Sequence, residues 1–118
     1  MTTEEMKQRT KDLALRVMKL VDHLPDSRKG RVIVDQILRS ATSVGANYRS
    51  ACRGRSRAEF AAKLGVALEE ADETGYWLEL IVEGGLITGK RVKALQMEAG
   101  EITAMLAAAL KSTRQGER

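Results

Sequence analysis

Five basic residues lie close together in the sequence: Arg49, Arg53, Arg55, Arg57 and Lys63. They stand where one segment with helically spaced apolar residues ends and the next such segment begins. Glu59 is the one acid in that span. Arginine forks suit phosphate oxygens, and free N–H groups at a helix start beginning at Ser56 can add to an anion site. The neighbouring Tyr48 falls on the predicted core stripe, so base stacking is not expected. The cluster predicts salt-sensitive, weakly sequence-selective binding to the phosphate backbone of RNA or DNA.

Residues suited to catalysis are scarce. The chain has one histidine, His23, and one cysteine, Cys52. The histidine lies at the end of a predicted helix, where its side chain interacts favourably with the helix dipole. The cysteine lies on the predicted buried stripe of its helix, where a small core residue is expected. The acidic run Glu69–Glu73 lacks the Glu-x-x-His pairs of bundle metal sites, so a solvated or ion-paired helix face is the simpler interpretation. We therefore expect no enzyme activity, catalytic residue, metal, cofactor or small-molecule substrate.

Charge is segregated along the chain, whose net charge is +4. The segment 64–87 carries no base and six acids: Glu69, Glu70, Asp72, Glu73, Glu79 and Glu83. Segregation of this kind favours either a basic surface that binds an anionic partner or ion pairs between subunits. The alternative to nucleic-acid binding is therefore a self-associating scaffold or interaction module whose arginines pair with the acidic segment of a neighbouring copy.

Apolar side chains recur with helical spacing in four segments, and no strand pattern competes with them. The first helix is expected to open with a capping box of Thr2 and Glu5 and to stop at Pro25. The second is expected to span about 28–52, with Asp26 or Ser27 as its N-cap. A capping box of Ser56 and Glu59 is expected to open the third helix, which Gly84-Gly85 ends, and Thr88 is expected to cap the fourth. The stripe of the second helix is Val34, Ile37, Leu38, Ala41, Val44, Gly45, Tyr48 and Cys52. Short connections predict an all-α, antiparallel up-down-up-down four-helix bundle. Residues 1–118 form one domain, with a polar tail expected to fray from about residue 112.

Apolar side chains at the margin of the third helix suggest self-association. Tyr76, Trp77 and Leu80 make the later part of this helix hydrophobic nearly all round. The alternative is that the fourth helix or the turn at 84–86 buries them. Arg39 and Asn47 lie close to the core seam, and an ion pair of Arg39 with Glu70 or Glu73 would give them a structural role.

The compartment is suggested by two further features. A single cysteine cannot form an internal disulfide, and the first residues are acidic rather than apolar. No stretch approaches the roughly 20 apolar residues of a membrane span. A cytoplasmic protein that does not enter a membrane is therefore expected.

The second and third helices also carry a family motif. Its residues are Leu38-Arg39-Ser40-Ala41, Ser43-Val44-x-Ala46-Asn47, Arg55-Ser56-x-x-Glu59-Phe60, and then Leu64, Ala67, Leu68 and Glu73. With this motif the chain resembles the 23S rRNA intervening-sequence proteins, or S23 family. It departs from the family pattern at Ser50, where an acid is usual, and at Glu69-Glu70, where Gly-Ser is often found.

The resemblance implies an antiparallel four-helix bundle that assembles into homopentamers. Some members of the family are encoded within inserted segments of large-subunit rRNA genes. A related group serves the reverse transcriptases of diversity-generating retroelements and binds nucleic acid through a basic surface. Many members have no established activity.

Overall fold

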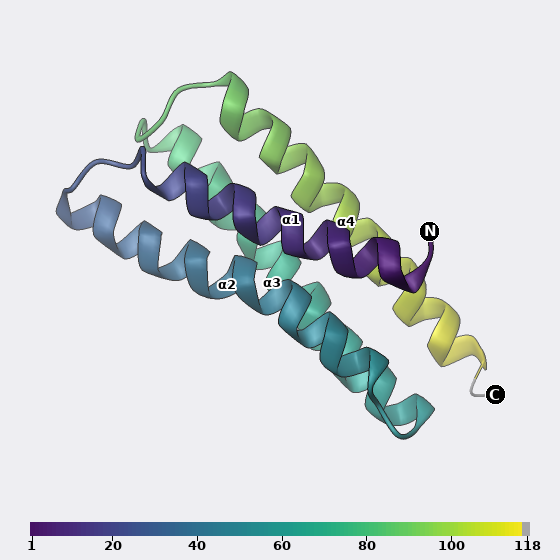
Figure 1. Cartoon of the computed structure of the whole chain (residues 1–118). Coiled ribbons are helices and arrows are strands. Elements are labelled where there is room, and N and C mark those ends of the chain that lie inside the picture. The colour runs from purple at the N-terminus through teal and green to yellow at the C-terminus, as the bar shows by residue number, and fades with distance from the viewer. Residues whose placement is uncertain (117–118) are drawn as a thin grey trace.

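The computed structural model describes residues 1–116, which form four helices joined by short loops. The helices are α1 (Thr3–Val21), α2 (Arg28–Cys52), α3 (Arg57–Glu83) and α4 (Lys90–Gly116). Successive helices run antiparallel, and each packs against its two neighbours around a ring (Figure 1). The bundle measures 49 × 21 × 21 Å. The predicted all-α up-down-up-down bundle is confirmed, and none of the helices within 1–116 is long and apolar enough to cross a membrane.

Hydroxyl side chains begin three of the helices. Thr2 Oγ1 accepts from the Glu5 N–H at 3.1 Å, and Glu5 accepts in return from the Thr2 N–H, which satisfies two otherwise free donors of α1. Ser27 Oγ accepts from the Gly30 N–H at 3.1 Å. Ser56 Oγ accepts from the Glu59 N–H at 3.0 Å, which is one half of the expected capping box.

Two helix boundaries differ from expectation in α4. The helix begins at Lys90, one position later than a cap at Thr88 would place it, because Gly89 adopts a left-handed φ of 55° directly before it. It then continues to Gly116, past the point where we expected the tail to fray. The Thr113 hydroxyl donates to the Ala109 carbonyl at 2.8 Å, and the Arg57 guanidinium donates to the Gly116 carbonyl. The last two residues of the predicted tail lie outside the described residues.

The core is a continuous aliphatic seam, centred on fully buried side chains such as Leu13, Ile37, Leu78 and Ile102. The seam of α2 is shifted from the predicted stripe. Buried positions include Ile33, Ser40 and Ala51, whereas Val34, Leu38 and Cys52 are only half-buried. The reason is that α2 faces both α1 and α3, so its buried arc is set by two partners rather than by its own apolar period.

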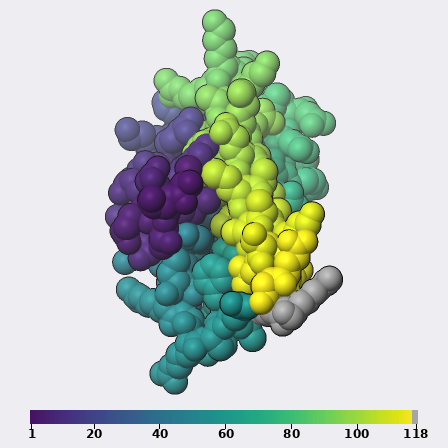
Figure 2. Space-filling model, turned by 90° about the vertical axis from the view of Figure 1, so that its right-hand side faces the viewer, coloured from purple at the N-terminus to yellow at the C-terminus, as the bar shows by residue number. Residues whose placement is uncertain are grey.

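A charged cluster joins the first and last helices. Arg9 of α1 donates from Nε and Nη2 to both carboxylate oxygens of Glu98 in α4, each at 2.7 Å, and Nη2 also lies 2.9 Å from Glu101. The α1–α4 contact is the smallest of the four around the ring. Figure 2 shows these two helices lying side by side on one face of the molecule. Arg9 thus reinforces the thinnest seam.

Candidate nucleic-acid interface

The basic corner is the turn from α2 to α3 together with the helix ends beside it. The chain leaves α2 at Cys52 and enters α3 at Arg57, so the turn is only four residues long. Gly54 makes this tight turn possible, because a Cβ there would lie 3.0 Å from both the Ala51 carbonyl oxygen and the Phe60 nitrogen. The short turn keeps the arginines on both sides of it at one end of the bundle.

All five cations of the basic corner are exposed: Arg49, Arg53, Arg55, Arg57 and Lys63. Within residues 1–116 none of them forms an ion pair with a carboxylate. Arg57 instead donates to the backbone carbonyl of Gly116. The charged groups of the other four therefore face solvent and can exchange water for phosphate oxygens, while Arg57 keeps further N–H donors beyond the one used by Gly116.

The end of α4 brings two further cations to this corner. The contact between Arg57 and Gly116 places the last turn of α4 against the start of α3, and Figure 2 shows the two segments touching. Lys111 and Arg114 are exposed in that part of α4. Sequence reasoning missed them, although an up-down-up-down order already places the end of the fourth helix beside the turn between the second and third.

Arg39 lies outside the basic corner and is engaged within the bundle. Its guanidinium bridges α2 to α3 by donating to Glu70 at 3.1 Å and to Glu73. Glu73 also accepts from Trp77 Nε1 at 3.2 Å. Asn47 Nδ2 donates to the Ser43 carbonyl of its own helix at 2.8 Å. These polar groups have partners inside the chain, which is the arrangement of a structural network.

The aromatic pair on α3 is divided between core and surface. Trp77 and Leu80 are half-buried and pack against the core, whereas Tyr76 is 52% exposed. The two rings meet edge to face with centroids 5.2 Å apart. The open apolar surface is therefore narrower than the sequence suggested, because Trp77 turns towards Glu73 and the core.

Tyr76 borders a groove of about 340 Å³ between α3 and α4. Its floor is made of small residues, including Gly75, Ala99 and Gly100, and its rim carries Asp72 and Glu79. A Cβ added to Gly75 or Gly100 would meet no atom within 4 Å. Close approach of helices inside this chain therefore does not explain these two glycines, contrary to the usual reason for a glycine in a helix.

The residues weighed for catalysis lie apart. Cys52 is half-buried at the end of α2, and His23 is exposed just beyond α1. Burial, together with the adjacent Cys52, raises the pKa of Tyr48. Within residues 1–116 no three histidine, cysteine or acidic side chains are grouped as metal ligands.

Comparison with known proteins now assigns the chain to a family. The sequence model of the 23S rRNA-intervening sequence protein family matches residues 3–108. The chain belongs to this family. A crystal structure of a protein of unknown function from the S23 ribosomal protein family of Bacteroides thetaiotaomicron is 39% identical, with a TM-score of 0.86 over 94% of this chain and 99% of that one. No protein with a curated description matches the chain.

The family match covers α1, α2, α3 and most of α4, and it confirms the resemblance read from the motif. All five cations of the basic corner lie inside the part that matches the 23S rRNA-intervening sequence proteins, whereas Lys111 and Arg114 follow its end at residue 108. The family name refers to a place in 23S rRNA genes rather than to a reaction. Function has therefore to be argued from the surface of this chain.

Proposed function

We propose that this protein is a non-enzymatic, self-associating helical bundle that binds the phosphate backbone of RNA or DNA through its basic corner. The observation that carries the proposal is the set of exposed cations at the turn between α2 and α3, none of which has a carboxylate partner within residues 1–116. Arg9 and Arg39, by contrast, form ion pairs with glutamates of the bundle.

The chemistry of the corner favours backbone contacts over base reading. Arginine donors match phosphate oxygens in pairs, and no exposed aromatic ring stands beside them for stacking, since Tyr48 is buried. Each phosphate that is neutralised releases counterions, so that affinity falls as salt rises. Structured RNA of any sequence is the probe that suits such a surface.

The test is an electrophoretic mobility shift with structured RNA at several salt concentrations. Changing Arg53, Arg55 and Arg57 together to Ala removes three cations of the corner. This variant is expected to bind more weakly, and its slope of log K against log[salt] is expected to be about 2–3 units shallower.

The matched control changes Arg28, Lys29 and Lys93 to Ala, which removes the same charge from exposed positions outside the corner. We expect this control to lose less affinity and to keep most of the salt slope. Equal binding by the corner variant and the natural protein would refute the assignment to the basic corner.

A scaffold without nucleic-acid binding is the second candidate, and one observation favours it. The outer face of α3 exposes Glu69, Asp72, Glu79 and Glu83, and none of these forms an ion pair within residues 1–116. This acidic face complements the basic corner of another copy. Such pairing would suit a ring of subunits, and a homopentamer is our proposal for the assembly by family resemblance.

Native mass measurement in low and high salt separates the two candidates. A scaffold held by these ion pairs dissociates in high salt and shifts no RNA, because exposed pairs are screened. A nucleic-acid-binding assembly held by apolar contacts at Tyr76, Trp77 and Leu80 keeps its mass while RNA is released. The lone, half-buried Cys52 and the absence of disulfides among the described residues support our proposal of a cytoplasmic location.

A further inference from the structure

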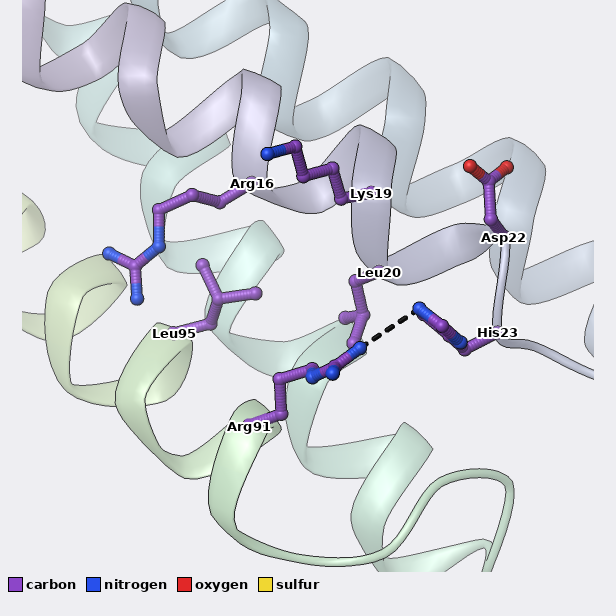
Figure 3. A pocket seen from close by; sticks show the side chains of 7 residues that line it. All are labelled: Arg16, Lys19, Leu20, Asp22, His23, Arg91 and Leu95. Carbon is purple, nitrogen blue, oxygen red and sulfur yellow. Dashed lines mark hydrogen bonds between the residues drawn. The ribbon is translucent and has the colours of Figure 1, made fainter.

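A second cationic site lies between the end of α1 and the start of α4. The pocket there has a volume of about 390 Å³ and is lined by the cations Arg16, Lys19 and Arg91, by His23, and by Leu20 and Leu95 (Figure 3). The basic corner lies at the other end of the bundle, beside the turn between α2 and α3 (Figure 1). The two sites therefore share no residue.

Two arginines reach into this pocket from facing helices. Figure 3 shows Arg91 extending from α4 towards His23, whereas the Arg16 guanidinium extends from α1 towards α4 on the other side of Leu95. One phosphate therefore reaches both guanidinium groups when the exposed Arg16 side chain changes rotamer and turns towards Arg91. Neither forms an ion pair within residues 1–116. The hydrogen bonds from Arg9 lower the pKa of Glu98 and the charge of Arg16 adds to this, but both oxygens of Glu98 are already bound by Arg9.

Two acids lie near Arg16, since Asp12 and Glu98 line the adjoining groove with it, but neither forms an ion pair with it within residues 1–116. Asp22 is the one acid of the pocket lining, and its carboxylate points away from Arg91 in Figure 3. Lys19 stands in the last turn of α1, where the free carbonyls carry partial negative charge. Figure 3 shows its ammonium group pointing back along α1 towards Arg16, so that Lys19 adds positive charge to the pocket.

His23 holds Arg91 in place. Arg91 Nη1 lies 2.9 Å from His23 Nε2, and because a guanidinium can only donate, Nε2 is the acceptor in this hydrogen bond. This bond uses one of the five donors of Arg91 and leaves the others to face the pocket. His23 is thus a positioning residue for the guanidinium.

The floor and the size of the pocket indicate that the anion carries an organic group. Leu20 and Leu95 form the floor with little area exposed to solvent. The volume falls within the range of sites for small organic ligands, about 300–1,000 Å³. A phosphate held between two arginines, with an organic group lying over two leucines, fits this arrangement.

We propose that the α1–α4 pocket binds a phosphate monoester dianion, with Arg16 and Arg91 holding the phosphate oxygens and His23 orienting Arg91. The phosphate can belong to a free nucleotide-sized molecule or to the 5′ end of an RNA, and the chemistry of recognition is the same. Sequence reasoning gave no signal of the site because its parts come from distant segments; His23 and Arg91 are 68 positions apart.

Calorimetric titration of the full chain with adenosine 5′-monophosphate, with inorganic phosphate and with adenosine tests the proposal. The monophosphate is expected to bind saturably, phosphate more weakly, and adenosine not at all. Arg16→Gln and Arg91→Gln should each weaken binding about tenfold or more, because each removes charge-assisted bonds to the anion. The control variants Lys11→Gln and Lys93→Gln remove exposed cations from the same two helices and should change affinity less than about twofold.

The role of His23 is tested by rescue. His23→Ala should weaken binding of the monophosphate, whereas His23→Gln, which keeps an acceptor for Arg91, should restore most of the affinity. Thermal melts of every variant show whether a loss of affinity comes from unfolding. If one does, the affinities of His23→Gln and His23→Ala are compared at a temperature where both variants are folded, and that comparison decides the role of His23.

Two further arms separate the ligand sources and the two proposals. A short RNA with a 5′-phosphate is compared with the same RNA carrying a 5′-hydroxyl, and tighter binding of the first alone assigns the site to RNA ends. The corner variant, with Arg53, Arg55 and Arg57 changed to Ala, should still bind the monophosphate normally. Adenosine binding as tightly as its monophosphate, no saturable binding of any phosphate, or equal losses in the control variants would overturn the proposal.

Discussion

Replacing Arg9 by Gln is expected to lower the free energy of unfolding by about 2 kcal/mol. The Arg9 and Glu98 side chains are 24% and 17% exposed, and two bonds of 2.7 Å join them. The pair lies between exposed ion pairs, worth about 0–1 kcal/mol, and buried ones, whose disruption costs about 3–5 kcal/mol. For a chain of this length, a loss of about 2 kcal/mol corresponds to a fall in Tm of about 6–12 °C.

The loss should also depend on pH in a stated direction. The bonds from Arg9 lower the pKa of Glu98 below its ordinary value. A carboxyl with a depressed pKa in the folded state stabilises the protein fully above its unfolded pKa, and this contribution disappears as pH falls through the folded pKa. The difference in stability between the natural protein and Arg9→Gln should therefore be largest near neutral pH and shrink below about pH 4.5.

Urea or thermal unfolding, followed by circular dichroism at fixed protein concentration and at pH 7, 5 and 3, measures both effects. Lys11→Gln is the control, because it removes an exposed cation from the same helix. The double variant Arg9→Gln with Glu98→Gln should recover part of the stability, since it no longer leaves a half-buried carboxylate unpaired. If Arg9→Gln behaved like Lys11→Gln at pH 7, or if its deficit were unchanged at pH 3, the reasoning would be wrong.

Three other substitutions test smaller features by Tm. Gly75→Ala is expected to stabilise the isolated chain by up to about 1 kcal/mol, since its Cβ would meet no atom within 4 Å. If the natural protein self-associates as proposed and this variant does not, another copy fills the groove. Gly45→Ala should instead lower Tm, because its Cβ would stand 3.1 Å from the Oγ1 of the buried Thr10; a Tm as high as that of Gly75→Ala would contradict this. Ser40→Ala should cost less than about 1 kcal/mol, because the Thr74 hydroxyl retains its 2.8 Å bond to the Glu70 carbonyl, and a larger fall would mean that the hydroxyl pair matters more than its geometry indicates.

The four helices could be predicted because their signals are local. Apolar spacing, the hydroxyl side chains Thr2, Ser27 and Ser56, and the glycine at 84 each act within a turn or two of the chain. Gly89 was missed as the boundary of α4 for the same reason, since Thr88 offers an equally local signal one position earlier. What decides between them is the left-handed φ that only the three-dimensional turn reveals.

The contacts that join distant segments could not be predicted in the same way. The partners of Arg9 lie 89 and 92 positions away, and helix periodicity does not give the register of one helix against another. Lys111 and Arg114 reach the basic corner for the same topological reason. The exposed cations of the corner were identified correctly as a cluster because they adjoin one short turn, whereas the pocket at Arg16 and Arg91 depends entirely on the fold.

The thin seam between α1 and α4 also has a consequence for how the chain folds. Contacts from α1 to α2, α2 to α3 and α3 to α4 all join sequence neighbours across short turns, so their formation costs little loop-closure entropy. Closing α4 onto α1 is the one step that must bring together residues as distant as Arg9 and Glu98. We therefore expect folding to begin at the extensive α2–α3 contact and to end when Arg9 closes the ring, with the low contact order giving fast folding up to that last step.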